Sequence, residues 1–196
     1  MRPAERELEL RDGARVAVRP IRAGDREAIR EAFGRLSPET RYRRFLSSAE
    51  RLSESDLRYL TEVDHSAHEA FVAFDPVTRD GVGVARFIRD PERPTVAEAA
   101  VVVGDEWQNR GLGTALCRVL VERARELGIE AFTATLLAEN QRMIHVLESL
   151  GPTQVVSSDG PTITVELAIP REGIGDSMRE LLRSTAKGRA RLRTRR

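Results

Sequence analysis

The stretch that decides the fold is DEWQNRGLGTAL, Asp105–Leu116. Just upstream, residues 95–103 read TVAEAAVVV, and their apolar, β-branched character predicts a buried strand. Downstream, residues 111–127 repeat apolar side chains at helical spacing with charged residues between them, which predicts an amphipathic helix. Gly111 and Gly113 therefore lie where a strand turns into a helix.

This strand–glycine–helix order predicts an anion site. A helix begins with backbone N–H groups that have no partner inside it, and its dipole adds partial positive charge there. Glycines leave those N–H groups open to a ligand, most often a phosphate. A P-loop is excluded because no Gly-Lys pair is followed by Ser or Thr. A dinucleotide fingerprint is disfavoured because Leu116 stands at the place of its third glycine.

Composition indicates an ordinary globular chain. Its 196 residues, 40% hydrophobic and 32% charged, fit one domain with a full core, which we place at residues 1–170. No run of 18 apolar residues exists, and the charged N-terminus does not resemble a signal peptide. The single cysteine, Cys117, excludes an intramolecular disulfide and a Cys-cluster zinc site. We therefore expect a cytoplasmic protein with no membrane partner and no metal.

The C-terminal part, residues 171–196, differs in charge from the rest. Residues 183–196 carry seven Lys or Arg and no acid, which leaves residues 1–182 at a net charge of −6. We expect a terminal helix over residues 173–183, then a basic tail. The tail is either a solvated segment or an arm that touches nucleic acid, an acidic partner or the protein's own acidic face. Its lack of aromatic residues argues against base stacking.

Periodicity and turn signals predict the remaining elements. Asp-Gly turns at residues 12–13 and 159–160 indicate hairpins at the two ends of the domain. The expected strands cover residues 69–75, 81–88, 95–103 and 130–138. Helices are expected over residues 25–34, after Ser37-Pro38, after Ser53, over 111–127 and after Asn140. This order favours an α/β or α+β mixed sheet with helices packed on it.

The motif and the element order resemble those of a known family. Residues 108–113, QNRGLG, match the Q/R-x-x-G-x-G/A signature of the GNAT superfamily of N-acetyltransferases. Residues 139–151, ENQRMIHVLESLG, resemble its last helix, which an Asn opens. The resemblance implies the GNAT fold, with a mixed, mostly antiparallel twisted sheet flanked by helices, and acetyl-CoA as co-substrate. Residues 19–25 and 35–45 are similar to the bacterial Pat-type branch of protein-lysine acetyltransferases.

The resemblance also implies where acetyl-CoA binds. The glycine loop would hold the pyrophosphate, Asn140 would contact the CoA arm, and a backbone N–H of residues 101–103 would polarise the thioester carbonyl. We expect Arg110 to add a charge-assisted bond to phosphate, and Gln108 and Asn109 to shape the loop. The residues assigned to the cofactor are Val101, Val102, Val103, Gln108, Asn109, Arg110, Gly111, Leu112, Gly113, Thr114, Asn140 and Met143.

Glu98 is the candidate general base. It interrupts an otherwise apolar strand, where a carboxylate is costly unless it faces a cleft or a partner. Partial burial would raise its pKa toward the working range of a base, and Pat-like proteins use a Glu at this position. The alternative is a solvent-facing strand residue.

Other candidate groups receive weaker assignments. Leu147 stands where many GNAT enzymes have a Tyr general acid, so we assign no acid. Cys117 and His145 are expected to be structural or exposed, and His65 to be a loop residue, although a place near the acceptor is open. No nucleophile motif is present, which favours direct transfer over an acyl-enzyme. Tyr42 and Phe45 either pack in the core or line the acceptor side.

The sequence thus predicts an acetyl-CoA-dependent N-acetyltransferase, with a protein lysine as acceptor. Two alternatives remain open. The acceptor could be a small amine such as a polyamine, amino acid or aminoglycoside, or the chain could be a non-catalytic acyl-CoA sensor. A homodimer is a further expectation.

Overall fold

The computed structural model describes residues 4–46 and 50–170. The strands are β1 Arg6–Glu9, β2 Arg15–Pro20, β3 His68–Phe74, β4 Gly81–Arg89, β5 Val96–Val103, β6 Ala131–Leu137, β7 Thr153–Asp159 and β8 Thr162–Ala168. The α-helices are α1 Arg26–Arg35, α2 Pro38–Phe45, α3 Glu54–Thr61, α4 Leu112–Glu126 and α5 Gln141–Glu148. The terminal helix and basic tail expected over residues 171–196 lie outside the described residues.

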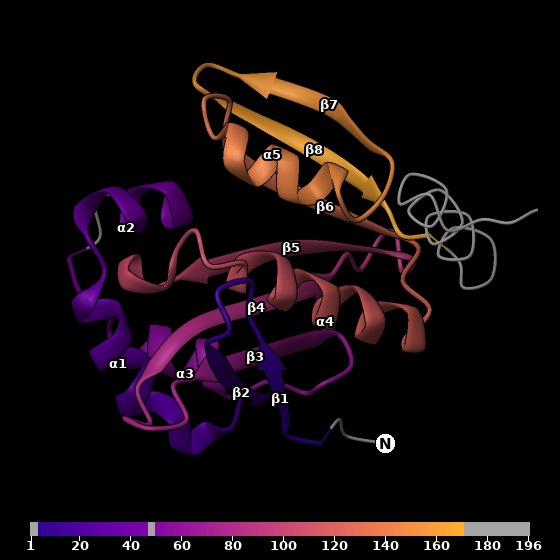
Figure 1. Cartoon of the computed structure of the whole chain (residues 1–196). Coiled ribbons are helices and arrows are strands. Elements are labelled where there is room, and N and C mark those ends of the chain that lie inside the picture. Colours follow the sequence, from indigo (N-terminus) through magenta and orange to yellow (C-terminus); the bar gives the residue numbers. More distant parts are fainter. Residues whose placement is uncertain (1–3, 47–49, 171–196) are drawn as a thin grey trace, which may run out of the picture.

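The strands form one sheet in the order β1-β2-β3-β4-β5-β6-β8-β7 (Figure 1). Every neighbouring pair in it is antiparallel except β5 and β6, which run parallel. This arrangement confirms the mixed, mostly antiparallel sheet expected from the sequence. Both Asp-Gly hairpins are present, as β1–β2 and β7–β8.

Helix starts follow the predicted capping residues. The Ser37 hydroxyl accepts a hydrogen bond from the Thr40 N–H, with Pro38 in the first turn of α2. Ser53 caps α3 through the Asp56 N–H, and Asn140 caps α5 through the Met143 N–H. Each cap satisfies a backbone donor that the helix itself leaves unpaired. The sequence signals for these three helices are therefore confirmed.

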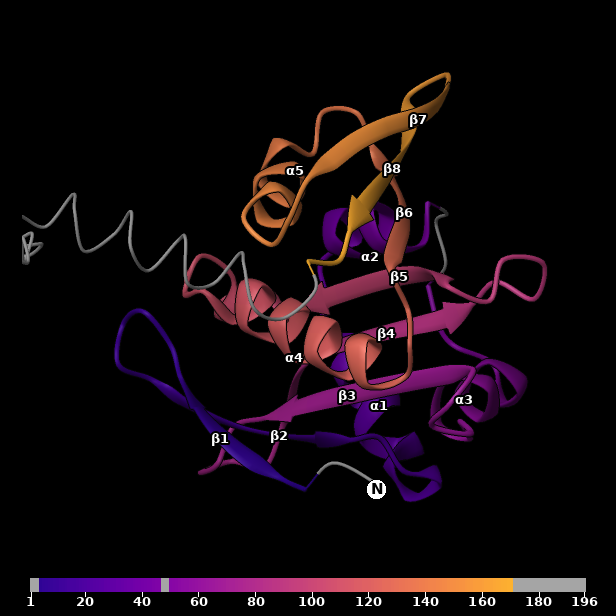
Figure 2. The ribbon, with the colours of Figure 1, turned by 90° about the vertical axis from the view of Figure 1, so that its right-hand side faces the viewer.

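The helices cover both faces of the sheet (Figure 2). Helix α4 packs on β3–β5, and the larger core lies beneath it and α5. Helices α1 and α3 cover the opposite face over a smaller core that contains Ile29, Leu57 and Val72. Gly83 lets α4 approach β4 closely, since a Cβ there would lie 3.0 Å from the Leu116 side chain. Within the described residues, no helix is both long and apolar enough to cross a membrane.

A buried ion pair ties α4 to β3. Glu69 is fully buried, and its carboxylate accepts hydrogen bonds from Arg123 Nε at 2.9 Å and pairs with His65 Nδ1 at 2.7 Å. Arg123 also donates to the His65 carbonyl at 3.0 Å and to Glu126 at 2.7 Å. Because α4 begins at the glycine loop, this cluster helps to fix the helix whose N-terminus forms the candidate anion site.

We expect Arg123→Ala to lower the free energy of unfolding by about 3 kcal/mol, because it leaves a buried carboxylate without its cation. Urea denaturation measures the change. Arg118→Ala is the matched control, since Arg118 is exposed on the same helix, and it should cost less than about 0.5 kcal/mol. Equal losses in the two variants would contradict the role given to the Glu69–Arg123 pair.

Candidate active site

The site begins where β5 and β6 separate. Their parallel pairing covers only Val96–Glu98 against Ala131–Thr133 in the described structure. Beyond that point β5 stays paired with β4 and β6 with β8, so a groove opens between the two halves of the sheet. The groove has a volume of about 490 Å³. It is lined by backbone or side chains of Arg11, Thr40, Arg43, Arg44, Val101–Val103, Gln108, Asn109, Gly111, Gly113, Thr114, Asn140, Arg142, Met143, His145, Val146 and Ser149.

The alternation of backbone groups along β5 shows which N–H groups face this groove. The Gly104 N–H donates to the Val82 carbonyl on β4 at 2.9 Å. Since successive N–H groups of a strand point to opposite sides, the Val102 N–H also points to β4. The N–H groups of Val101 and Val103 then point to the β6 side, and the Val103 carbonyl there accepts from Gln108 Nε2 at 3.3 Å. The sequence alone could not show which N–H groups of Val101, Val102 and Val103 face the groove.

The glycine loop presents its backbone at one end of the groove. Gly111 is the N-cap of α4 with φ +93°, a left-handed conformation that favours glycine, and Asn109 has φ +64°. The unpaired N–H groups at the start of α4 belong to the turn that includes Gly113 and Thr114, both in the groove lining. Leu112 is fully buried in the core. Its assigned contact with the cofactor can therefore come only from its backbone.

Arg110 lies differently from expectation. Its Nε donates to Asp12 at 2.5 Å, and its guanidinium stacks on the Trp107 ring at 4.3 Å from the centroid. It is absent from the groove lining, where Arg11 of the β1–β2 turn stands instead. The Arg11 N–H donates to the Arg110 carbonyl at 3.1 Å, so the hairpin turn braces the loop. The phosphate contact expected of Arg110 stays a prediction, and the place of Arg11 in the groove wall was not predicted, because Arg11 reaches it only through the fold.

A hydrogen-bond network joins the loop to α2. Asp105 accepts from the Ser37 N–H at 2.8 Å and from the hydroxyls of Ser37 and Thr40 at 2.7 Å each. Burial would raise the pKa of Asp105, but these hydrogen bonds hold it below its ordinary value. Thr40 in turn accepts from Gln108 Nε2 at 3.0 Å, and Gln108 Oε1 accepts from Arg142 at 3.3 Å. Gln108 therefore shapes the loop, as expected, and links it to α2 and α5.

Asn140 and Met143 lie at the start of α5, on the far wall of the groove. Asn140 Oδ1 accepts the Met143 N–H at 3.2 Å, which leaves the amide nitrogen of Asn140 for a ligand. Among the residues that the structure describes, four arginines and no acidic residue line the groove: Arg11, Arg43, Arg44 and Arg142. The arrangement suits a polyanionic ligand that runs from the helix N-terminus into the gap.

A second cavity of about 260 Å³ adjoins the groove and contains Glu98. The two share Arg43, Arg44, Val101, Asn140 and Met143 in their linings. Glu98 is the last residue of β5 that pairs with β6, so it stands at the point where the strands part. Its side chain is exposed, and the partial burial expected from the sequence is wrong. The base candidate thus faces solvent and can be reached from outside.

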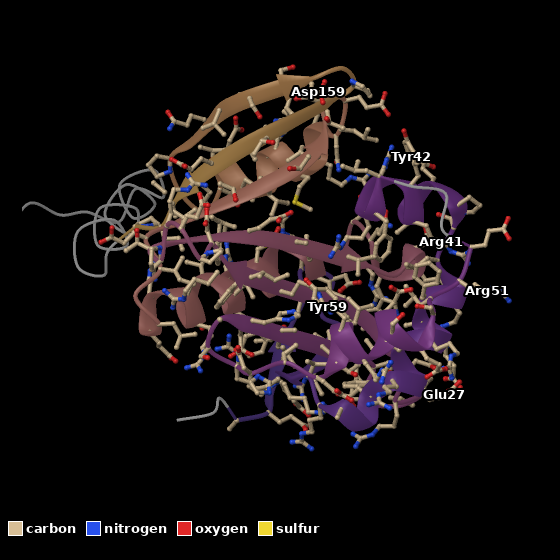
Figure 3. All side chains as sticks on the ribbon, turned by 180° about the vertical axis from the view of Figure 1, so that it is seen from behind. Glu27, Arg41, Tyr42, Arg51, Tyr59 and Asp159 are labelled. Atoms are coloured by element: carbon tan, nitrogen blue, oxygen red, sulfur yellow. The ribbon has the colours of Figure 1, made fainter. Side chains whose placement is uncertain are left out.

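The other candidate side chains divide into those that line the Glu98 cavity and those that lie outside it. Cys117 and Leu147 are buried but contribute to the wall of the Glu98 cavity. Burial raises the pKa of the Cys117 thiol to about 12, which keeps it protonated and a poor nucleophile at neutral pH. Phe45 lines this cavity, whereas Tyr42 is 45% exposed and lines neither (Figure 3). His65 belongs to the Glu69 ion pair rather than to the acceptor side.

Known proteins share this architecture. A family model described as Acetyltransferase (GNAT) family matches residues 28–151. Acetyltransferase Pat of Mycolicibacterium smegmatis is 33% identical over 163 residues, 83% of this chain and 48% of that protein. An acetyltransferase of Pseudomonas aeruginosa is 36% identical over 146 residues, 72% of this chain and 77% of that protein. The chain thus spans about half the length of the Pat relative.

A solved structure agrees with these matches. The crystal structure of the GNAT domain of S. lividans PAT superposes with a TM-score of 0.79 at 30% identity, covering 86% of this chain and 99% of that domain. The split sheet, the glycine loop at the start of α4 and the family match over most of the described residues agree with one another. The chain belongs to the GNAT family of acetyltransferases, with Pat-type proteins among its homologues.

Proposed function

We propose that this protein transfers the acetyl group of acetyl-CoA directly to a primary amine, with Glu98 as general base and a protein lysine as acceptor. The observation that carries the proposal is the position of Glu98 where β5 leaves β6, beside a groove lined by four arginines and a helix N-terminus. The same proposal includes a cytoplasmic location, because the enzyme needs a supply of acetyl-CoA.

The groove has the chemistry that CoA requires. The pyrophosphate would lie on the N–H groups at the start of α4, where the helix dipole favours negative charge. The pantetheine amides would pair with the β5 backbone that β6 leaves open, and Asn140 with the CoA arm. Val101, whose N–H points into the gap, would hold the thioester carbonyl oxygen.

The transfer itself needs few groups. Glu98, directly or through one water, accepts the proton that the acceptor ammonium must lose before its nitrogen can attack. The nitrogen then bonds to the carbonyl carbon, and the negative charge on the oxygen is stabilised by the Val101 N–H. The carbon–sulfur bond breaks and CoA leaves as the thiolate, whose low basicity makes a general acid dispensable. The second proton on the nitrogen passes to solvent or to the departing thiolate, which leaves a neutral amide. Leu147 has no proton to donate and therefore cannot act as a general acid.

The acceptor assignment rests on the Pat-type homologues and on access. Glu98 is exposed, so a lysine side chain on another protein can reach it without that protein entering a deep pocket. A small amine is the second candidate acceptor, because the Glu98 cavity of about 260 Å³ could enclose one. Incubating the protein with radiolabelled acetyl-CoA, cell lysate and small amines distinguishes the two.

We expect Glu98→Gln to lower kcat by about a hundred-fold or more, since a positioned base contributes about that much, while the Kd for acetyl-CoA stays unchanged. Glu92→Gln is the matched control, because Glu92 is an exposed glutamate in the turn before β5. Steady-state kinetics and calorimetry measure the two quantities. Full activity in Glu98→Gln would refute the base, and tight acetyl-CoA binding with no transfer by wild type would favour a sensor.

Gly111→Ala should weaken acetyl-CoA binding by about ten-fold or more, because alanine disfavours φ +93° and the loop must shift. Gly128→Ala introduces the same kind of strain, at φ +72°, at the other end of α4 with nothing within 4 Å. Both variants should lose roughly 1–2 kcal/mol of stability. If both lost affinity equally, the effect would come from stability rather than from the loop.

Cys117→Ala should transfer acetyl groups at the same rate as the wild-type protein, because direct transfer uses no thiol of the protein. Wild-type protein is incubated with acetyl-CoA in the absence of an acceptor, and the reaction is then quenched. Mass spectrometry of this sample should find no acetylated cysteine. A stable acetyl group on Cys117, together with loss of activity in the variant, would replace direct transfer by an acyl-enzyme route.

A further inference from the structure

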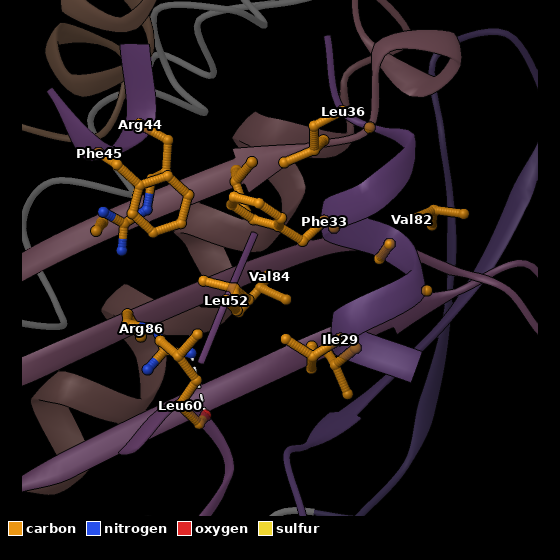
Figure 4. A pocket seen from close by; sticks show the side chains of 17 residues that line it. Ile29, Phe33, Leu36, Arg44, Phe45, Leu52, Leu60, Val82, Val84 and Arg86 are labelled. Carbon is orange, nitrogen blue, oxygen red and sulfur yellow. Dashed lines mark hydrogen bonds between the residues drawn. The ribbon is translucent and has the colours of Figure 1, made fainter. Parts of the chain in front are cut away.

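Two arginines meet on the acceptor side of the sheet, and one of them, Arg86, is explained neither by CoA binding nor by the base. Arg44 of α2 and Arg86 of β4 lie along one side of a chamber of about 60 Å³, whose other walls include Phe33 and Leu60 (Figure 4). Arg44 also lines the CoA groove and the Glu98 cavity. It therefore stands where the three spaces meet.

Neither guanidinium has an anionic hydrogen-bond partner within residues 4–46 and 50–170. Arg86 is 5% exposed. Two of its five N–H donors bond to neutral acceptors, which are His68 Nε2 at 3.2 Å and the Leu60 carbonyl at 3.1 Å. Arg44 stacks on the Phe45 ring at 4.9 Å, and with the described residues it forms no hydrogen bond or ion pair. Most of the donors of both groups remain available.

The electrostatics of the chamber confirm a surplus of positive charge. Burial lowers the pKa of Arg44, against the opposing effects of Glu98 and Tyr59. Burial and then repulsion from Arg44 lower the pKa of Arg86 to about 10. His68 is neutral at physiological pH, since burial and Arg86 lower its pKa to about 4. Among the described residues, Glu98 is the carboxylate whose charge acts on Arg44, and buried cations without anions are costly.

The strand register sets the spacing of these groups. On the β4–β5 ladder Ile88 pairs with Glu98 and Arg86 with Ala100, so Arg86 and Glu98 share one face as diagonal neighbours. The Cβ atoms of such neighbours lie roughly 7–8 Å apart. A ligand held by Glu98 at its amine would therefore bring groups a few bonds away into reach of the arginines.

We propose that Arg44 and Arg86 form a subsite for a carboxylate of the acceptor, so that the enzyme prefers amines that carry a carboxylate close to the reactive nitrogen. The inference rests on the proposed function, in which an amine binds at Glu98. The forked guanidinium matches a carboxylate geometrically, and the chamber has room for one carboxylate and a few waters. An acidic residue beside a lysine and the carboxylate of an amino acid both fulfil this requirement, whereas a polyamine does not.

The first test needs no acceptor. Glutarate is titrated calorimetrically into protein saturated with CoA, so that the other groove arginines, Arg11, Arg43 and Arg142, do not compete for it. Wild type should bind glutarate saturably, and Arg44→Gln should weaken this binding by about ten-fold. Arg58→Gln, which removes an exposed arginine of the neighbouring α3, should bind like wild type. Absent glutarate binding, or binding unchanged in Arg44→Gln, would overturn the subsite.

The second test compares matched acceptors. Lysine peptides with Glu or Gln beside the lysine represent the protein source, and amino acids with their amides represent the small-molecule source. Wild type should favour the carboxylate member of at least one pair by about ten-fold in kcat/KM, and Arg44→Gln should bring that ratio close to one. Arg44→Lys, which keeps the charge but not the fork, should retain part of the preference.

The outcomes separate the two proposals. Acetylation of all acceptors without a carboxylate preference would overturn the subsite and leave the proposed function intact. Glutarate binding that depends on Arg44, without acetylation of any acceptor, would support the subsite and refute the proposed function. A fall in CoA affinity in Arg44→Gln with the carboxylate preference retained would place Arg44 in the CoA groove and overturn the proposal. Because the Arg44 side chain forms no hydrogen bond with the described part of the chain, its replacement leaves no partner there unpaired, and thermal denaturation checks the fold.

Discussion

The site depends on one constraint, which is that β5 can pair with β6 for only three residues. Past Glu98, β5 follows β4 and β6 follows β8, and the two halves of the sheet separate. A strand within a protein core normally satisfies its backbone groups with both neighbours, because an unpaired buried amide is costly. Here one side of β5 is left to a ligand instead. The groove and the place of Glu98 follow from this early separation, and so does the oxyanion contact that we propose for Val101.

The structure keeps the groove open through contacts that hold its walls. Asp105 and Gln108 join the glycine loop to α2 and α5, and the Glu69–Arg123 pair fixes α4 against β3. Asp105 and the Glu69–Arg123 pair stand outside the groove lining, whereas Gln108 and Arg142 belong to it and join the glycine loop to α5.

Local signals predicted much of this molecule, and long-range packing decided the rest. Capping residues such as Ser37 and Asn140, and the Asp-Gly turns, act within a few residues of chain, so the elements were predictable from sequence. The glycine loop was recognisable for the same reason. Arg11 and Arg44 reach the site only through the folded chain, and no local pattern marks them. The contact of Arg110 with Asp12 was not predictable either, because the two residues are distant in sequence, and the exposure of Glu98 is a property of the folded chain.

The central claim is that acetyl-CoA completes the open side of β5, and amide hydrogen exchange followed by NMR tests it residue by residue. Strand alternation directs the N–H groups of Val101 and Val103 into the groove and that of Val102 to β4. The account predicts that acetyl-CoA slows exchange at Val101, Val103 or both, and leaves Val102, already paired with β4, nearly unchanged. Unchanged exchange at Val101 and Val103 in the saturated protein would contradict it, because the ligand would then lie elsewhere.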